Sequence, residues 1–468
     1  MTRASGRLVL AVILALSACG DDDGGGGAND SGGGRGDASP DVDARANPPE
    51  AGLPDGATPP PPPPDLGPRP DTGPPTPGSV VCDEPAFPDG TGLRRWPYLQ
   101  SVTTTSARVA WTSTRGGRGV VRYGRRGSDT WLEVEATAEA FPTSRTADDV
   151  DYTAFDATLS GLEAGAEHCY EILEDGAVVA TGLRLTSAWT GPERPLRILA
   201  FGDSGTGSSG QLALRDQMLG REFDVFLHLG DMAYDDGTFV EFEETVFSVY
   251  RDLLHRTPTF PVIGNHEYHT DDGQPYIDVY YLFEQTMRAS DSERYYSFDY
   301  GDVHFVAFDS NPEMLDTVSS SATDDMVDWI RADLAASSAS WKIAFCHHPP
   351  YSSGDHGSDT DVQRLVLPVL EEGGVDLVLV GHDHHYERSV PIFDGSEAAG
   401  DARAITYIVA GAGGAGLRSA GGDWFTASVN DETHSYLSFT IEGCLGHGEA
   451  IARDGATIDR FELDGCER

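Results

Sequence analysis

The chain contains a stretch in which histidine and aspartate residues alternate directly after an apolar run. Residues 381–388 read GHDHHYER and follow the apolar segment 375–380. An apolar run bounded by glycines is typical of a buried strand, so His382 and His384 would leave the same strand end together. Neutral imidazole is the commonest protein ligand of transition metals. Because a lone His-x-His turn is more often a polar loop, a metal site here needs further ligands.

Four other segments repeat the order of apolar strand, small turn and ligand-type residue. They are 196–201 followed by Asp203, 224–229 followed by Asp231, 259–263 followed by Asn265, and 341–346 followed by His347. In α/β sheets, ligands bind beyond the carboxyl ends of the strands. Five such strand ends therefore predict one shared site rich in the oxygen and nitrogen ligands of metals.

In this order the five motifs resemble those of the calcineurin-like metallophosphoesterases and, more narrowly, the purple acid phosphatases, over about residues 97–443. Most calcineurin-like enzymes begin with Asp-x-His, but Gly205 occupies the histidine position here. Tyr234, three residues after Asp231, stands where purple acid phosphatases have a metal-bound phenolate. A phenolate oxygen favours ferric iron. The phenol at position 234 could therefore replace the missing imidazole at position 205 as a ligand of the first metal.

This resemblance implies a binuclear centre of Fe(III) and a divalent iron, zinc or manganese ion. Its implied ligands are Asp203, Tyr234 and His384 for the first metal, Asn265, His347 and His382 for the second, and Asp231 as a bridge. Two metals about 3.5–4 Å apart can share one carboxylate. Two further histidines, His266 and His356, are implied to contact the phosphoryl group or assist the leaving group.

Other histidines and the end of the 381–388 motif have less direct roles. We expect His348 behind the ligands or at the substrate edge, and His385 facing solvent. Residues 386–388 are expected to brace their loop. His228 and His304 lie inside apolar segments, where a histidine is usually a hydrogen-bonded core residue.

The leading functional interpretation is hydrolysis of phosphate monoesters by an acid phosphatase. The alternatives are a phosphodiesterase or nucleotidase on the same centre, or a surface binding lipoprotein. A net charge of -44 argues against nucleic acid as a partner, because no basic face is available to neutralise phosphates. Small phosphoesters are therefore the expected substrates. The sequence predicts no particular oligomeric state.

The N-terminal segments predict export and attachment to a membrane. Residues 1–19 have a basic start and a short apolar run, as in a signal peptide. Residues 16–19 resemble the bacterial lipoprotein cleavage motif, which implies a lipid anchor on Cys19 and a place in the cell envelope. The alternative is an ordinary signal peptide with a chance cysteine. Residues 20–81 are rich in Gly, Asp and Pro and predict a disordered linker.

Two folded regions are expected after the linker. Residues 82–190 resemble a fibronectin type III-like all-β sandwich, with His168 at the usual corner tyrosine and no catalytic cluster. Its expected strands are 107–111, 119–123, 153–159 and 169–173. Residues 194–468 predict an α/β (α+β) four-layer metallophosphatase sandwich. The expected helices there are 211–220, 239–254, 324–336 and 361–372, with a hairpin over 295–308.

An exported chain permits disulfides. Cys444 and Cys466 flank the last hairpin-like segment and are candidates to pair, as are Cys82 and Cys169. Cys346 ends an apolar strand and is expected to be a buried free thiol.

Overall fold

A computed structural model of the chain describes residues 79–282 and 293–465, which lie in one compact unit. The predicted signal segment with Cys19, nearly all of the linker, and Cys466 lie outside the described residues. Within the described part, no helix combines the length and the apolar character that crossing a membrane would require.

The first region consists of two four-stranded antiparallel sheets, in the orders β1-β2-β6-β5 and β4-β3-β7-β8. Their strands are β1 (Leu93–Gln100), β2 (Ser106–Ser113), β3 (Gly119–Arg125), β4 (Leu132–Glu135), β5 (Thr137–Phe141), β6 (Tyr152–Ser160), β7 (Glu167–Glu174) and β8 (Ala177–Thr186). A short helix, α1 (Thr143–Thr146), follows β5. The four strands expected from the sequence lie within β2, β3, β6 and β7. The likeness to fibronectin type III domains stays a prediction.

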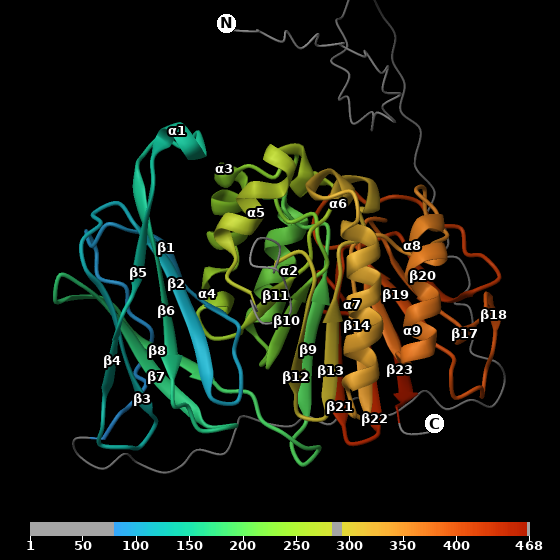
Figure 1. Ribbon diagram of the computed structural model, residues 1–468, viewed down its shortest axis with the longest axis horizontal. Coiled ribbons are helices and arrows are strands. Elements are labelled where there is room, and N and C mark those ends of the chain that lie inside the picture. Colours follow the sequence, from blue (N-terminus) through green and yellow to red (C-terminus); the bar gives the residue numbers. More distant parts are fainter. Residues whose placement is uncertain (1–78, 283–292, 466–468) are drawn as a thin grey trace, which may run out of the picture. The chain divides into compact units, whose positions relative to one another are not determined.

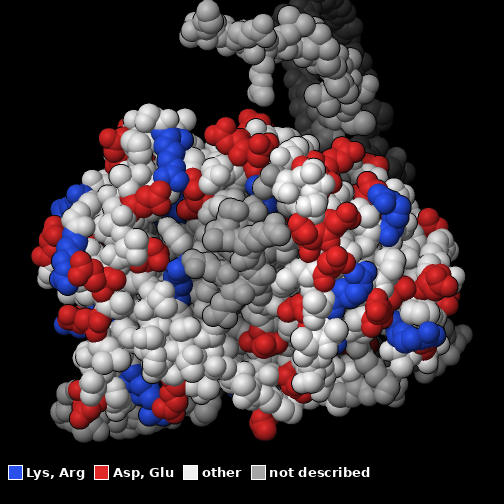
Figure 2. Space-filling model, in the orientation of Figure 1, with Lys and Arg blue, Asp and Glu red and all other residues white. Residues whose placement is uncertain are grey.

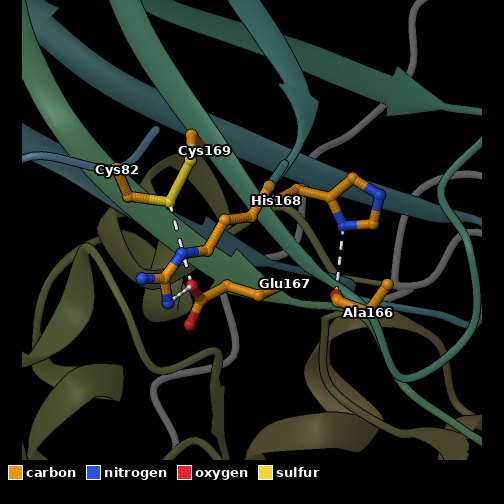
Figure 3. The surroundings of a disulfide bond; sticks show 6 residues. Cys82, Ala166, Glu167, His168 and Cys169 are labelled. Atoms are coloured by element: carbon orange, nitrogen blue, oxygen red, sulfur yellow. Dashed lines mark hydrogen bonds and ion pairs between the residues drawn. A yellow bond between two sulfur atoms is a disulfide. The ribbon is translucent and has the colours of Figure 1, made fainter. Parts of the chain in front are cut away.

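A disulfide between Cys82 and Cys169 joins the segment before β1 to β7 and confirms that predicted pair (Figure 3). Next to it, His168 closes the turn that leads into β7. Its Nδ1 lies 3.1 Å from the Ala166 carbonyl oxygen, and the backbone N–H of Glu163 donates to its Nε2 at 3.4 Å. His168 therefore stabilises a backbone corner, as expected.

The remaining cysteines differ in how far the structure tests them. Cys346 is a buried free thiol, as predicted. Cys444 is disulfide-bonded. Its predicted pairing with Cys466 concerns a residue outside the described ones.

Two large sheets form the mixed α/β region that follows. The six-stranded sheet has the order β11-β10-β9-β21-β22-β23, and the seven-stranded sheet has the order β12-β13-β14-β15-β19-β16-β20. The first contains β9 (Leu196–Phe201), β10 (Val225–His228), β11 (Thr259–Pro261), β21 (Ser435–Glu442), β22 (Leu445–Ala452) and β23 (Thr457–Asp464). The second contains β12 (Tyr296–Tyr300), β13 (Val303–Ala307), β14 (Trp341–Phe345), β15 (Leu377–Val380), β16 (Tyr386–Ser389), β19 (Thr406–Ala410) and β20 (Thr426–Asn430). A small hairpin joins β17 (Ile392–Phe393) to β18 (Ser396–Glu397).

The seven-stranded sheet is apolar on both faces, because alternate residues of its strands point to opposite sides. Phe345 of β14 belongs to the core that includes the six-stranded sheet, whereas its neighbour Ala344 belongs to a second core. That second core also contains Ile330 of helix α7 (Ala322–Ala336) and Leu370 of helix α9 (Leu367–Gly373). Figure 1 draws both helices in front of the seven-stranded sheet. Helices thus cover one face of this sheet, and its other face packs in the core that it shares with the six-stranded sheet.

The helices of this region are short. They are α2 (Ser209–Leu219), α3 (Phe239–Glu241), α4 (Arg251–Leu254), α5 (Gln274–Val279), α6 (Pro312–Val318), α7 (Ala322–Ala336), α8 (Thr360–Leu365) and α9 (Leu367–Gly373). Two expected helices are interrupted. Residues 239–254 contain a π-helical turn, Phe242–Phe247. There the hydroxyls of Thr245 and Ser248 donate to carbonyls four residues back, which competes with the regular helix. Residues 361–372 break before Pro368, which has no N–H to donate.

Contacts also join β1 to the α/β region. Arg95 forms a buried ion pair with Glu243, and the Tyr98 hydroxyl donates to the Val279 carbonyl at 2.7 Å. Figure 2 shows acidic side chains spread over one face of the molecule, with basic side chains beside them in several places.

The predicted hairpin is present as β12 and β13, and it contains His304. The imidazole lies between two carboxylates, with Nδ1 2.8 Å from Asp299 and Nε2 2.9 Å from Asp333 of α7. Burial lowers the pKa of His304, but these two hydrogen bonds outweigh burial and raise the pKa to about 9. His228 differs, because its Nε2 lies 2.8 Å from Ser204 Oγ while its Nδ1 has no partner among the described residues.

We expect His304 to make stability depend on pH in the alkaline range. Its folded pKa of about 9 exceeds the ordinary value of 6.5, so its contribution is complete below pH 6.5 and disappears as the pH rises through 9. The contribution should be about 2 kcal/mol, less than the full shift implies, since the Asp299 side chain is 72% exposed. Urea unfolding of wild type and His304→Gln at pH 6 and pH 10 measures it. If the free energies of unfolding of the two proteins differed by the same amount at both pH values, His304 would not be the source of the pH dependence.

Candidate metal centre

Five parallel strands from the two large sheets end at the candidate site. Asp203, Asp231 and Asn265 follow β9, β10 and β11 of the six-stranded sheet, which run parallel. His347 and His382 follow β14 and β15 of the seven-stranded sheet, which are also parallel. The two sheets thus bring their carboxyl ends to one place, as the strand-end pattern predicted.

The turns that present these residues have an unusual backbone. Asp203, Asp231 and His382 have φ values of 56°, 50° and 69°. Few residues other than glycine adopt this left-handed region, and such conformations cluster at functional sites. The geometry turns each side chain out of its strand direction and towards the others.

One group of donor atoms surrounds Asn265. Its Oδ1 lies 3.1 Å from His347 Nε2 and 3.1 Å from His382 Nδ1, and those two nitrogens are 3.3 Å apart. His347 Nε2 is also 3.2 Å from Asp231 Oδ2. These are the four residues that the resemblance assigned to the second metal and the bridge.

A second group surrounds the Tyr234 hydroxyl. This oxygen lies 3.3 Å from Asp203 Oδ1, 3.2 Å from Asp231 Oδ2 and 3.2 Å from His384 Nε2. Asp231 Oδ2 therefore belongs to both groups, which is the position that a bridging oxygen needs.

Two of the candidate ligand histidines form hydrogen bonds through Nδ1, on the side of the ring away from the site. Their Nε2 atoms face the site. His347 Nδ1 lies 2.8 Å from the Leu229 carbonyl oxygen, and His384 Nδ1 lies 2.7 Å from the Gly416 carbonyl oxygen. Only an N–H can bond to a carbonyl, so both Nε2 atoms are left with a free lone pair when the rings are neutral. Burial, and next the charge of Arg418, lowers the pKa of His384 to about 4, which keeps that ring neutral at pH 7.

This donor set fits metal cations. Ligand atoms that bind one metal at about 2.0–2.2 Å, roughly at right angles, are about 3 Å apart, which matches the separations in both groups. The site also needs positive charge. Burial lowers the pKa of His347, but the adjacent Asp231 carboxylate raises it to about 10. A proton on His347 can balance the charge of Asp231 only. A metal cation in the same place can also accept the lone pairs of Asn265 and His382.

The structure gives a reason for glycine at position 205, where the resemblance would place a histidine. A Cβ atom at Gly205 would lie 1.8 Å from the Met232 carbonyl oxygen, so a side chain at this position requires the backbone to move. The Tyr234 backbone N–H donates to the Gly205 carbonyl at 2.9 Å. The close approach of these two turns leaves no room for an imidazole at position 205. It also places the Tyr234 phenol at the site.

Glu267 is a residue whose role the sequence did not indicate. Its carboxylate is fully buried beneath the Asp231 turn. Oε2 accepts from the backbone N–H groups of Asp231 at 2.9 Å and Gly264 at 2.8 Å, and Oε1 accepts from Met232 at 2.8 Å and Ala233 at 3.2 Å. The available signal was an acidic residue beside the ligand turn at Asn265. One carboxylate thus joins the turns that carry two candidate ligands.

The two histidines expected to contact substrate lie at the edge of the donor groups. His266 Nδ1 lies 2.6 Å from the Asp235 carbonyl oxygen, and its Nε2 is 3.9 Å from Asp231 Oδ2. The exposed His356 ring stacks on the His382 ring, with 4.4 Å between centroids. Both are therefore close to the candidate ligands without belonging to either group.

His348 also lies near the site, as expected. Its ring centroid is 4.3 Å from that of His382, and its Nδ1 is 2.9 Å from Ser310 Oγ. The Ser310 oxygen also accepts the backbone N–H groups of His347 and His348. Ser310, which follows β13, had no recognisable sequence signal, because its contacts are to residues almost forty positions later.

The expectation that His385 faces solvent is wrong. Its side chain is fully buried, and its Nε2 lies 3.1 Å from Glu387 Oε2. The reason is that Gly354 packs directly against this turn, where a Cβ would lie 2.6 Å from His385 Cε1. Glu387 itself braces neighbouring segments, as predicted, since it also accepts the backbone N–H of Ser353.

Part of the chain is similar to known proteins. Residues 196–386 match the calcineurin-like phosphoesterase family. Purple acid phosphatase 4 of Arabidopsis thaliana is 26% identical over 245 residues, which cover 46% of this chain and 70% of that protein. An uncharacterized protein of Mycobacterium tuberculosis is 25% identical over 309 residues, 55% of this chain and 57% of that protein. The match therefore spans little more than half the length of that relative.

Solved structures show the same fold. The purple acid phosphatase PPD1 from yellow lupin seeds superposes with a TM-score of 0.66 at 20% identity, over 79% of this chain and 74% of that chain. PhoD superposes with a TM-score of 0.56 at 11% identity, over 81% and 90%. The chain thus carries a calcineurin-like metallophosphoesterase domain of mixed α/β fold, with purple acid phosphatases among its homologues. These homologues imply a binuclear metal centre, and the Asp203, Asp231 and His347 side chains could hold a metal ion.

Proposed function

We propose that this chain hydrolyses small phosphate monoesters as an acid phosphatase with a binuclear centre. Fe(III) would be held by Asp203, Tyr234 and His384. A divalent iron, zinc or manganese ion would be held by the remaining ligands, with Asp231 shared between the two metals.

The observation that carries this proposal is the position of the Tyr234 hydroxyl. It lies within 3.3 Å of Asp203, Asp231 and His384, in the place where Gly205 leaves no room for an imidazole. Burial, and next the charge of Asp231, raise the pKa of this phenol well above its usual range. A phenolate here therefore requires a strongly charged cation, and ferric iron suits a hard phenolate oxygen.

When bound, two cations supply activation of a water molecule near neutral pH and neutralisation of charge on the phosphoryl group. The chain's own groups then have to place the substrate. His266, held through Nδ1 by the Asp235 carbonyl, is available at the first-metal side to contact a phosphoryl oxygen. His356, stacked on His382, is available at the opposite side to contact the substrate or donate a proton to the leaving oxygen.

Charge near the site supports a small anionic substrate. The backbone N–H of Arg418 donates to the His384 carbonyl at 3.2 Å, and its guanidinium forms no ion pair within 4.0 Å in the part of the chain that the structure describes. Most other described arginines form ion pairs, for example Arg388 with Asp459. Arg418 is therefore a candidate to attract a phosphoryl dianion, while the acidic surface disfavours long polyanions.

The predicted N-terminal signal supports a location for this activity outside the cytoplasm. A lipid on Cys19 would attach the protein to the cell envelope, and residues 20–81 would act as a tether. Detergent partition of wild type and Cys19→Ser tests this part of the proposal independently of catalysis.

Tyr234→Phe should remove the visible colour of the iron-loaded protein. A phenolate bound to Fe(III) gives a ligand-to-metal charge-transfer band, and phenylalanine keeps the ring volume but loses the ligand oxygen. Absorption spectra of both proteins, with metal content measured on the same samples, check this expectation. Identical spectra would show that Tyr234 is not a ligand and would remove the support for ferric iron.

Substrate class needs a separate measurement. Wild-type protein loaded with iron and a divalent metal should hydrolyse p-nitrophenyl phosphate faster than bis(p-nitrophenyl) phosphate. The opposite ratio would favour a phosphodiesterase on the same centre. Turnover of neither ester by protein with a full metal complement would favour a binding protein.

A further inference from the structure

The loop that carries His356 is attached to the turn that carries two candidate metal ligands. Asp383, between His382 and His384, is fully buried. Its Oδ2 accepts the Ser352 hydroxyl at 2.5 Å, and its Oδ1 accepts the backbone N–H of His356 at 3.1 Å. A single carboxylate thus holds both ends of the segment 352–356.

Glu387 provides a second attachment for the same loop. Its Oε2 accepts the backbone N–H of Ser353 at 2.8 Å and the Ser353 hydroxyl at 2.9 Å. The Ser353 hydroxyl oxygen in turn accepts the backbone N–H of Gly422 at 3.0 Å. The segment is therefore also held by β16 and by the loop that precedes β20.

Side chains along the metal-ligand turn alternate in what they contact. His382 and His384 reach the two donor groups, whereas Asp383 and His385 contact the loop and Glu387. The turn can approach the loop this closely because residue 354 is glycine. A Cβ there would lie 2.8 Å from Asp383 Cγ.

We propose that Asp383 is a positioning residue that holds the His356 imidazole over His382, at the distance where it can contact a substrate bound at the centre. The carboxylate supplies neither a metal ligand nor a substrate contact. It fixes the backbone at His356 from the same turn that presents His382 and His384, so a shift in that turn changes the position of His356. The catalytic part of this inference rests on the proposed phosphatase function.

The first test is a double-mutant cycle on the metal-loaded enzyme. Asp383→Asn keeps the shape of the side chain but turns one acceptor into a donor that faces the Ser352 hydroxyl or the His356 N–H. We expect kcat for an alkyl phosphate to fall about 10- to 100-fold, a typical cost of losing an outer contact, and to fall less for p-nitrophenyl phosphate. Adding His356→Ala to Asp383→Asn should cause little further loss, because both changes remove the same interaction.

A second readout does not depend on activity. Amide hydrogen exchange in the segment 352–358 should be faster in Asp383→Asn than in wild type, with iron content and visible absorption unchanged. Asp355→Asn is the matched control, since Asp355 lies exposed in the same loop and its side chain has no hydrogen bond among the described residues. The control should match wild type in both measurements.

The outcomes separate the possibilities. Additive losses in the cycle, or unchanged exchange in the loop, would overturn the positioning role. Loss of metal in Asp383→Asn would also overturn the positioning role, because the loss of activity would then come from the metal ligands on the turn and not from the position of His356. If Asp383→Asn does not fold, Ser352→Ala removes one of the two hydrogen bonds and should give a smaller change of the same kind. Absence of phosphatase activity in wild type, with exchange as expected, would reject the proposed function but not the attachment.

Discussion

Asp231→Asn should lose both cations and nearly all turnover. One oxygen of Asp231, Oδ2, lies 3.2 Å from both Tyr234 and His347, so a single substitution affects both donor groups. An asparagine offers one neutral carbonyl in place of a shared anion. We therefore expect a loss in turnover well beyond the roughly 10- to 100-fold that outer contacts typically contribute.

Metal analysis and steady-state kinetics of the purified variant check this expectation. Asp236→Asn is the matched control, because it removes the same charge from the same loop at a side chain that is 69% exposed. It should keep both metals and its activity. An Asp231→Asn protein that retains two metals per chain and most of its turnover would show that this carboxylate is not shared.

Glu267→Gln should give the second largest effect, mainly on stability and metal affinity. Four backbone N–H groups converge on the two carboxylate oxygens of Glu267, which leaves no acceptor for the new NH₂ group. The new NH₂ group would face backbone N–H groups, so hydrogen bonds from them to the carboxylate are lost. Hydrogen bonds to a charged acceptor contribute more stability than those to a neutral one. The expected loss is about 3 kcal/mol in the free energy of unfolding.

Urea unfolding of metal-free protein measures the effect on the fold, and metal titration measures the effect on the site. The exposed Glu244 gives a control, Glu244→Gln, with the same chemical change and little expected effect. A Glu267→Gln protein as stable as wild type would mean that the turns at Asp231 and Gly264 hold their shape without this carboxylate.

The strand ends of the candidate site were predictable from the sequence because each signal is local. An apolar run, a glycine and a ligand-type residue identify a buried strand and its exit without reference to other parts of the chain. Tyr234 was recognisable by its spacing from Asp231. The structure adds a reason why glycine at position 205 accompanies tyrosine at position 234. That reason is the short distance between the two turns, which cannot be read from the sequence.

Other features depend on contacts between distant segments, and these were not predictable. His385 looked like a solvent-facing turn residue, because nothing near it in the sequence indicates that the loop at Gly354 covers it. The acidic partners of His304 come from its own hairpin and from α7, and only the first is close in sequence. The break of the helix expected over 239–254 follows from hydroxyls that bond to carbonyls, for which composition gives only a weak signal.

The division of the ligands between two sheets has a consequence for how the centre assembles. The six-stranded sheet carries Asp203, Asp231 and Asn265 at its strand ends, and the seven-stranded sheet carries His347 and the two histidines after β15. Neither sheet alone carries all the residues that the proposed centre assigns to either metal. In the proposed centre, cations would therefore bind with full affinity only after the two sheets have packed together, and bound cations would then oppose the separation of the sheets by mass action. If the proposed centre forms, metal uptake would therefore be a late step of folding that stabilises the contact between the two sheets.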